Sequence, residues 1–403
     1  MKRLFSITVL PLLSASATIL HPLAVQTVKA ATMLSTSCIE KSLPVALAPG
    51  EPVQYQIYGE LCSQYPIEGR TVQVLVSGLT YDHNYWDFPY DNGRYSYVNS
   101  QTEAGYATFN IDRIGIGNSS RPPNNQVTLE SNTYVLAQIN QALRNGNIQG
   151  VKFDRIINVG HSFGSFGPIV NAVSQYGGVD GVILTGFLHN VNTEYANFAL
   201  NSFYSAQLDP VLSNQNLPDG YLTTLPGTRG SLYYNESNTD PQVIALDEQI
   251  KSTVTTSELA SLASAVLSDS SKQIKVPTLL AIGEEDNPFC TANICDSVEN
   301  VIAFEASFYS PEAQLQAYVL PNAGHDINLS LNAALWYSAA RQWSDRFVGT
   351  NVQSIPEPSF KFTFLALLSA AILQKFFANT KHAKRHNKVS RAKVKFIYNY
   401  EEN

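Results

Sequence analysis

The chain has 403 residues, of which 44% are hydrophobic and 15% are charged, and its formal net charge is −7 at pH 7. That length and composition suffice for one large domain or two modest ones with a buried core. Both ends of the chain are basic, so the part between them is more acidic than the total suggests. An acidic surface repels the phosphates of nucleic acids, so we expect no nucleic-acid partner.

Residues 1–30 predict a signal peptide. Lys2 and Arg3 precede an apolar run at 4–13, and the small-x-small pattern at 28–30 forms a cleavable position before Ala31. The alternative is an uncleaved N-terminal anchor, but the apolar run is short for a helix that spans a membrane. We therefore expect an exported chain that begins at Ala31.

The four cysteines fit an exported chain, because disulfides persist in oxidising compartments. Four thiols allow three pairings, and we favour the local ones, Cys38 with Cys62 and Cys290 with Cys295. No spacing among them matches the C-x-x-C of zinc or thioredoxin-type sites. The alternative, four free thiols, is typical of the cytosol.

After an N-terminal extension at 31–67, strand-like and helix-like segments alternate through 68–187. The predicted strands lie at 71–76, 106–111, 155–159 and 181–185, and the predicted helices at 131–143 and 162–175. The strands are short apolar runs, and the first helix repeats apolar residues at helical spacing. This alternation is typical of an α/β fold, a mostly parallel central sheet with helices on both faces.

The alternation stops at 188–272, where Tyr, Asn, Ser and Pro are frequent and only 259–267 has helical spacing. We interpret this segment as an inserted cap, whose many aromatic residues suggest an apolar entrance. The sheet pattern resumes in 273–350. Predicted strands lie there at 276–282 and 315–320, and a final helix at 329–347.

A G-x-S-x-G sequence lies where a predicted strand meets a predicted helix, with Gly160 and Gly164 on either side of Ser162. Glycines allow a tight turn that lifts the serine hydroxyl above the carboxyl edge of the sheet. The sequence therefore predicts Ser162 as a nucleophile. The alternative is a glycine-rich turn with a surface serine.

A serine hydroxyl needs a base, and the base is usually oriented by an acid. His325 follows the last predicted strand, in a loop that opens at the same sheet edge as Ser162. Asp286 follows the preceding strand and is the predicted acid, with Glu285 as the alternative. The order Ser162, Asp286, His325 is the order of α/β-hydrolases.

An oxyanion hole needs two backbone donors. We expect them to be the N–H groups of Phe163, directly after the nucleophile, and Leu79, in the loop after the strand at 71–76. Thr80, Tyr81 and Trp86 follow in sequence and are candidates for a substrate pocket. Ordinary packing is the alternative role for these side chains.

These motifs together resemble the α/β-hydrolase superfamily, in its capped AB-hydrolase branch, over about residues 68–347. The resemblance is carried by Gly78 with Trp86, the run Asp112–Ser120, the elbow 160–164, Gly283 with Asp286, and Gly324-His325. It implies an α/β-hydrolase fold with an inserted cap. This chain has Ser77-Gly78 where the family usually has His-Gly.

Residues 351–403 are expected to form a separate sorting segment. Pro356-Glu357-Pro358 comes first, an apolar stretch at 362–373 follows, and the remaining chain is basic. This arrangement resembles the PEP-CTERM sorting signal, which marks exported bacterial proteins for processing by an exosortase. The resemblance implies an exosortase-type partner and at least transient membrane anchoring. A simple tail anchor would have the same topology without cleavage.

Serine at the elbow favours acyl transfer to water, so we expect a serine hydrolase that cleaves a small-molecule or lipid ester. A peptidase or a C–C bond hydrolase uses the same scaffold, because fold does not fix substrate. A non-catalytic, surface-anchored binding module is the alternative from another class. The chemistry needs no cofactor, and the sequence contains no cluster typical of metal ligands.

Overall fold

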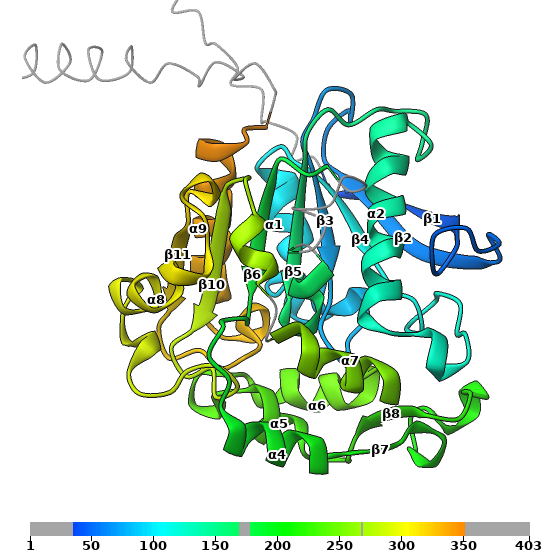
Figure 1. The fold of residues 1–403 in the computed structure, drawn as a ribbon, viewed down its shortest axis with the longest axis vertical. Coiled ribbons are helices and arrows are strands. Elements are labelled where there is room, and N and C mark those ends of the chain that lie inside the picture. Colours follow the sequence, from blue (N-terminus) through cyan, green and yellow to red (C-terminus); the bar gives the residue numbers. More distant parts are fainter. Residues whose placement is uncertain (1–34, 168, 170–177, 267–268, 351–403) are drawn as a thin grey trace, which may run out of the picture.

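A central sheet of eight strands dominates the computed structural model, which describes residues 35–167, 169, 178–266 and 269–350 (Figure 1). The strand order is β1-β2-β4-β3-β5-β6-β10-β11. From β4 to β11 all neighbours are parallel, whereas β2 is antiparallel to both β1 and β4. The predicted α/β class with a mostly parallel sheet is confirmed.

The parallel strands lie within two residues of their predicted bounds. They are β3 (Val72–Val76), β4 (Ala107–Ile111), β5 (Ile156–His161), β6 (Gly181–Thr185), β10 (Thr278–Gly283) and β11 (Gln316–Leu320). All residues of β3 to β6 and of β10 are buried, as expected for strands with helices on both faces.

Alternate strand residues pack into two separate apolar clusters, one on each face of the sheet. Val74 of β3 and Val182 of β6 belong to one cluster, whereas Leu75 and Ile183 belong to the other. The first cluster includes residues of α2 (Leu129–Asn145) and α8 (Val298–Glu305). The second includes residues of α1 (Tyr97–Glu103) and α9 (Ala333–Phe347). The prediction of helices on both faces is therefore confirmed.

The N-terminal extension contributes a hairpin that the sequence did not predict. Its strands are β1 (Ser37–Val45) and β2 (Tyr55–Ser63), and β2 pairs with β4. Cys38 and Cys62 face each other in this hairpin and form a disulfide. Cys290 and Cys295 form the second disulfide, so both predicted pairings are present in the structure.

The inserted segment 188–272 forms a cap over the carboxyl ends of the parallel strands (Figure 1). Its helices are α4 (Thr193–Asn201), α5 (Arg229–Tyr233), α6 (Pro241–Ile250) and α7 (Thr256–Val266). Its three short strands, β7 (Phe203–Ser205), β8 (Tyr221–Thr224) and β9 (Val254–Thr255), form an antiparallel sheet.

Some predictions fall on residues outside the described ranges. Of the helix expected at 162–175, the structure describes a 3₁₀ turn at Ser162–Ser165 and the residues around it. The predicted signal peptide at 1–30 and the predicted sorting segment at 351–403 lie outside the described residues altogether. Among the residues that are described, no helix is long and apolar enough to cross a membrane.

Candidate active site

Ser162 lies on a strained turn at the carboxyl end of β5. Its φ of 52° is in the left-handed region, which a residue with a side chain rarely adopts. A methyl group on Gly160 would lie 2.3 Å from the carbonyl oxygen of Gly164, and one on Gly164 would lie 2.4 Å from the carbonyl oxygen of Val76. Only glycine fits at either position, so the turn closes as the sequence pattern predicts.

His325 and Asp286 lie in the loops that follow the adjacent strands β11 and β10. The Nδ1 atom of His325 is 3.0 Å from both carboxylate oxygens of Asp286. Asp286 is fully buried, whereas the alternative acid, Glu285, is exposed to solvent. The contact with the imidazole is therefore made by Asp286.

Two glycines bring these loops together. A methyl group on Gly283 would lie 2.2 Å from the carbonyl oxygen of Gly324, and one on Gly324 would lie 2.5 Å from the backbone nitrogen of Asn235 in the cap. The acid loop and the base loop therefore touch through bare backbone. This close approach carries His325 to the sheet edge where Ser162 lies.

The charges around His325 favour its protonated form. Burial lowers the pKa of this imidazole, but the charge and hydrogen bond of Asp286, helped by the charge of Asp326, raise it above its ordinary value overall. A carboxylate that accepts a hydrogen bond from Nδ1 also fixes the tautomer of the neutral ring, so that Nε2 can accept a proton.

The loop that carries Leu79 is held from behind by Arg113. This guanidinium donates to the backbone oxygens of Ser77 and Gly78, at 3.0 Å each. The peptide group between Gly78 and Leu79 is planar and trans, so the N–H of Leu79 points away from Arg113. The hydroxyl of Ser77 donates to the carbonyl of Tyr81, 3.1 Å away, and closes the loop.

A cavity of about 420 Å³ lies between the sheet edge and the cap. Ser162 and His325 are both in its wall, together with Leu79 and Phe163. The rest of the described lining is mainly apolar: Phe166, Val191, Tyr195, Ala196, Ala199, Leu200, Phe203, Tyr233, Leu259, Leu262, Pro288 and Phe289. Its size and lining are typical of a small-molecule site.

Of the three residues expected in a substrate pocket, only Tyr81 lines this cavity. The Trp86 side chain is instead fully buried and packs against Tyr97 and Trp336. Thr80 is also buried, and its hydroxyl accepts a hydrogen bond of 2.9 Å from Arg229 of the cap. Trp86 therefore has the alternative role, ordinary packing in the core. Thr80 makes a structural contact with the cap.

Sequence reasoning did not find the contacts of His161 and Asp326. His161 precedes the nucleophile, and its Nε2 lies 3.1 Å from a carboxylate oxygen of Asp326, which follows the base. Both side chains are buried. Adjacency to Ser162 and His325 is the only sequence signal, and it does not reveal that the two residues meet.

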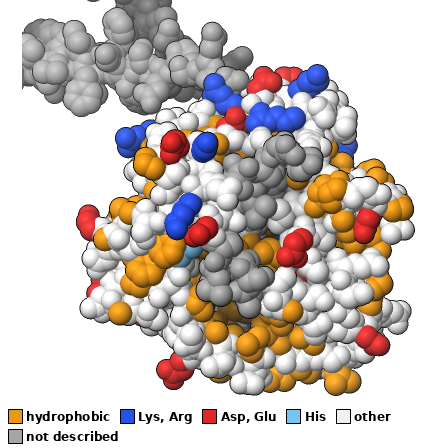
Figure 2. Space-filling view, in the orientation of Figure 1, with side chains coloured by type: hydrophobic (Ala, Val, Ile, Leu, Met, Phe, Trp, Pro, Cys, Tyr) orange, Lys and Arg blue, Asp and Glu red, His pale blue; other side chains and the backbone are white. Residues whose placement is uncertain are grey.

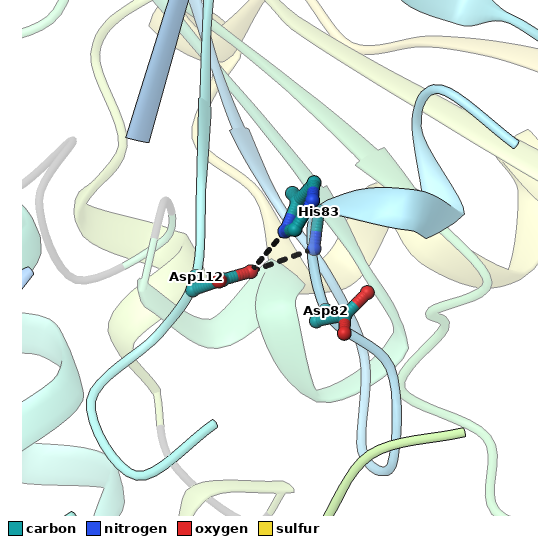
Figure 3. Close-up of side chains that lie close together, drawn as sticks. All are labelled: Asp82, His83 and Asp112. Carbon is teal, nitrogen blue, oxygen red and sulfur yellow. Dashed lines mark hydrogen bonds and ion pairs between the residues drawn. The ribbon is translucent and has the colours of Figure 1, made fainter. Parts of the chain in front are cut away.

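A second polar cluster, Asp82, His83 and Asp112, lies where the loops after β3 and β4 meet (Figure 3). Burial disfavours the protonated imidazole, yet the hydrogen bond and charge of Asp112 raise the pKa of His83 to about 9. The Asp112 carboxylate also accepts hydrogen bonds from the backbone N–H groups of His83 and Asn118. Asp82 accepts from the backbone and side chain of Asn84. The cluster is therefore a structural brace between the two loops.

Comparisons with known proteins agree with this architecture. E-2-(Acetamidomethylene)succinate hydrolase is similar in structure, with a TM-score of 0.51, 16% identity, and coverage of 76% of this chain and 100% of that one. A putative lipase from Acinetobacter baumannii has a TM-score of 0.50 and 15% identity over 77% of this chain and 92% of that one. A hydrolase from Pseudomonas aeruginosa has a TM-score of 0.50 and 15% identity over 77% and 98%. At these identities the likeness concerns the fold alone.

No curated protein matches the chain at a significant level. The sequence profile described as "Alpha/beta hydrolase family" matches residues 73–339, which is more than half of the chain. That range contains the elbow, the acid loop, the cap and the base loop. The chain belongs to the alpha/beta hydrolase family.

Proposed function

We propose that this protein is a serine hydrolase that cleaves esters with an apolar acyl group. The observation that carries the proposal is the wall of the cavity, where a strained Ser162 and the Asp286-bonded His325 occur together. In this proposal Ser162 is the nucleophile, His325 the general base and Asp286 the acid that orients it.

The reaction would proceed through an acyl-enzyme. The Ser162 hydroxyl oxygen attacks the ester carbonyl carbon while Nε2 of His325 accepts the hydroxyl proton. The N–H groups of Leu79 and Phe163 donate to the resulting oxyanion. Collapse breaks the bond to the alcohol oxygen, which takes the proton from His325. A water molecule, deprotonated by the same imidazole, then attacks the acyl carbon. The bond from that carbon to the Ser162 oxygen breaks, the oxygen takes the proton back from His325, and the acid is released.

The lining of the cavity supports an uncharged, apolar acyl group. Among the described residues that line it, none is Lys, Arg, Asp or Glu, and aromatic and aliphatic side chains predominate. A charged acyl chain would be buried there without a partner, which is unfavourable. Several apolar side chains of the cap are also exposed, among them Phe198, Leu200 and Leu208. Figure 2 shows apolar side chains gathered at the cap end of the molecule.

A fluorophosphonate probe tests the nucleophile directly. The purified full-length protein should be labelled and should hydrolyse p-nitrophenyl esters, and Ser162→Ala should abolish both. Ser165→Ala is the matched control, because Ser165 lies on the same turn with its hydroxyl bonded to the carbonyl of Thr185. A folded wild-type protein that is neither labelled nor active would contradict the proposal and favour a binding module.

We further propose that the protein is exported and sorted through its tail. The two disulfides support an oxidising compartment, because such bonds are rare in the cytosol. Mass spectrometry of the protein from its native cell envelope should find Ala31 at the N-terminus and cleavage after the Pro356-Glu357-Pro358 segment. Recovery of the intact chain from the cytoplasm would contradict export. An intact tail in the membrane would indicate a simple anchor without exosortase.

A further inference from the structure

A single buried carboxylate connects three of the four loops that carry the proposed catalytic groups. Asp326 belongs to the base loop, directly after His325. One of its oxygens lies 3.1 Å from Nε2 of His161 in the nucleophile elbow. The other accepts a hydrogen bond from the hydroxyl of Tyr81, in the oxyanion loop. Only 1% of the surface of Asp326 is exposed, so water does not replace either contact.

The partners of His161 define its protonation. Burial, with the nearby His325 charge, holds the pKa of His161 well below its ordinary value, so the ring is neutral. A carboxylate only accepts, so the hydrogen lies on Nε2 and points to Asp326. Nδ1 then accepts from the hydroxyl of Thr185, 3.0 Å away. Both ring nitrogens are therefore satisfied, and the ring has one orientation.

The oriented ring forms part of the surroundings of the proposed base. The His161 ring stacks on Tyr85 with centroids 4.3 Å apart, and its centroid is 4.8 Å from that of His325. Without Asp326, the N–H of His161 would be buried and unpaired, which favours rotation of the ring. Rotation would remove a contact that limits the position of His325 relative to Ser162.

The same carboxylate also reaches the cap. The Tyr81 hydroxyl lies between Asp326 and Asp247, 2.9 Å from the latter. Asp247 is bound by two nitrogens of Arg229, at 2.7 and 2.9 Å. The Arg229 guanidinium lies over the Tyr81 ring, 4.2 Å from its centroid. Tyr81 is therefore held from both sides, by the base loop and by the cap.

We propose that Asp326 is a positioning residue, whose carboxylate fixes the nucleophile elbow, the base loop and the oxyanion loop relative to one another through His161 and Tyr81. This inference rests on the proposed function, because it concerns the geometry of the same reaction. Asp326 itself does not line the cavity, so it should affect turnover rather than binding.

The experiment compares Asp326→Ala with Asp326→Asn in the full-length protein, using p-nitrophenyl ester hydrolysis. Asparagine keeps an oxygen for His161 and an amide for the Tyr81 oxygen, whereas alanine keeps neither. We expect Asp326→Ala to lower kcat by about 10- to 100-fold with KM nearly unchanged, since small displacements of reacting groups have effects of that size. Asp326→Asn should restore most of the loss.

A pH profile separates positioning from a merely structural role. The charge of Asp326 raises the pKa of His325, so its removal in Asp326→Asn should move the acidic limb of kcat/KM to lower pH. The matched control is Asp209→Asn, an equally buried aspartate paired with Lys251 in the cap. It should lower stability without moving the limb.

Three outcomes would overturn the proposal. They are an Asp326→Ala enzyme with wild-type kcat, an Asp326→Asn enzyme as impaired as Asp326→Ala, and an unmoved acidic limb. If Asp326→Ala does not fold, the position of the acidic limb of kcat/KM in Asp326→Asn decides whether the proposal stands. If the wild type lacks activity altogether, NMR of the histidine side-chain nitrogens still tests the geometry, because His161 should carry its proton on Nε2 only while Asp326 is present. Loss of activity with that signal intact would contradict the proposed function alone.

Discussion

The core and the cap of this protein are stabilised by different interactions. The core buries consecutive apolar strands between two layers of helices. The cap consists of short elements, and α4 has no fully buried residue. Buried ion pairs fix the cap instead: Arg229 with Asp247, Lys251 with Asp209, and, across to the core, Arg113 with Glu258. Apolar burial is non-directional, whereas an ion pair with hydrogen bonds fixes an orientation.

The two kinds of interaction have different tasks, since one stabilises the sheet and the other places the cap. Many small apolar contacts stabilise the sheet that presents the elbow, and no single one of them sets the geometry of the site. A few directional contacts set the cap over the cavity, and one of them, from Arg229 through Thr80 and Tyr81, ends in the loop of Leu79. The following variants test this contrast.

Gly160→Ala in the core should have the largest effect. The added methyl group would lie 2.3 Å from the Gly164 oxygen, which is backbone and cannot move without opening the elbow. We expect loss of fluorophosphonate labelling together with a lower melting temperature. Gly150→Ala is the control for backbone strain alone, because that glycine has a positive φ, which Gly160 does not, and has open space around it. Wild-type labelling of Gly160→Ala would contradict the tight turn.

Asp247→Ala should disrupt the cap without a steric clash. It leaves the buried Arg229 charge without its partner, which typically destabilises a protein by about 3–5 kcal/mol. Denaturant unfolding measures the loss. The double variant Arg229→Met with Asp247→Leu removes both charges and should recover most of the stability. Equal instability of the single and double variants would show that packing, rather than the ion pair, holds this part of the cap.

Ala196→Phe should change specificity with little effect on stability. Ala196 is on α4 and lines the cavity, so a phenyl ring there would occupy space needed by a long acyl chain. We expect KM for long p-nitrophenyl esters to rise about tenfold, the usual scale for steric discrimination in an apolar pocket, while short esters are unaffected. Asn197→Phe, at the exposed neighbouring position, is the control. An equal effect on short and long esters would place the acyl chain elsewhere.

The smallest of the expected effects concerns the pH dependence of kcat/KM. His325 must be neutral to accept a proton, so activity falls as the pH drops through its pKa. Burial lowers that pKa but Asp286 and Asp326 raise it above the ordinary value overall. The acidic limb of kcat/KM should therefore lie above the pH at which a free imidazole titrates. His83→Gln should leave the limb in place, because His83 is outside the cavity lining. A limb that moves in His83→Gln would show that another histidine controls it.

The sequence predicts the core well because its signals are local. Buried strands are short apolar runs, and the elbow needs glycines at fixed positions around Ser162. The disulfides join cysteines that are near in sequence. The hairpin β1–β2 was not predicted because β1 is mostly exposed and mixes charged with apolar residues, so it lacks the signature of a buried strand.

The partners within the site could not be predicted in the same way. Asp326 meets His161 and Tyr81 across 165 and 245 positions of the chain. No local pattern encodes which buried carboxylate meets which donor, because that depends on how loops from different strands converge. For the same reason Trp86, which is close to Tyr81 in sequence, lies in the core instead of the cavity.

The cap is inserted between β6 and β10, two strands that pair directly in the sheet. Because these strands are parallel, the insertion leaves the sheet at the carboxyl end of β6 and returns to it at the amino end of β10. An insertion between such neighbours can lengthen, shorten or be exchanged while the register of the core is preserved, because closing a longer loop adds little entropy. In evolutionary terms, the cap is a replaceable module: a lineage could alter the substrate by recombining this segment alone, provided that the replacement supplied a carboxylate for the guanidinium of Arg113 and a partner for the hydroxyl of Tyr81.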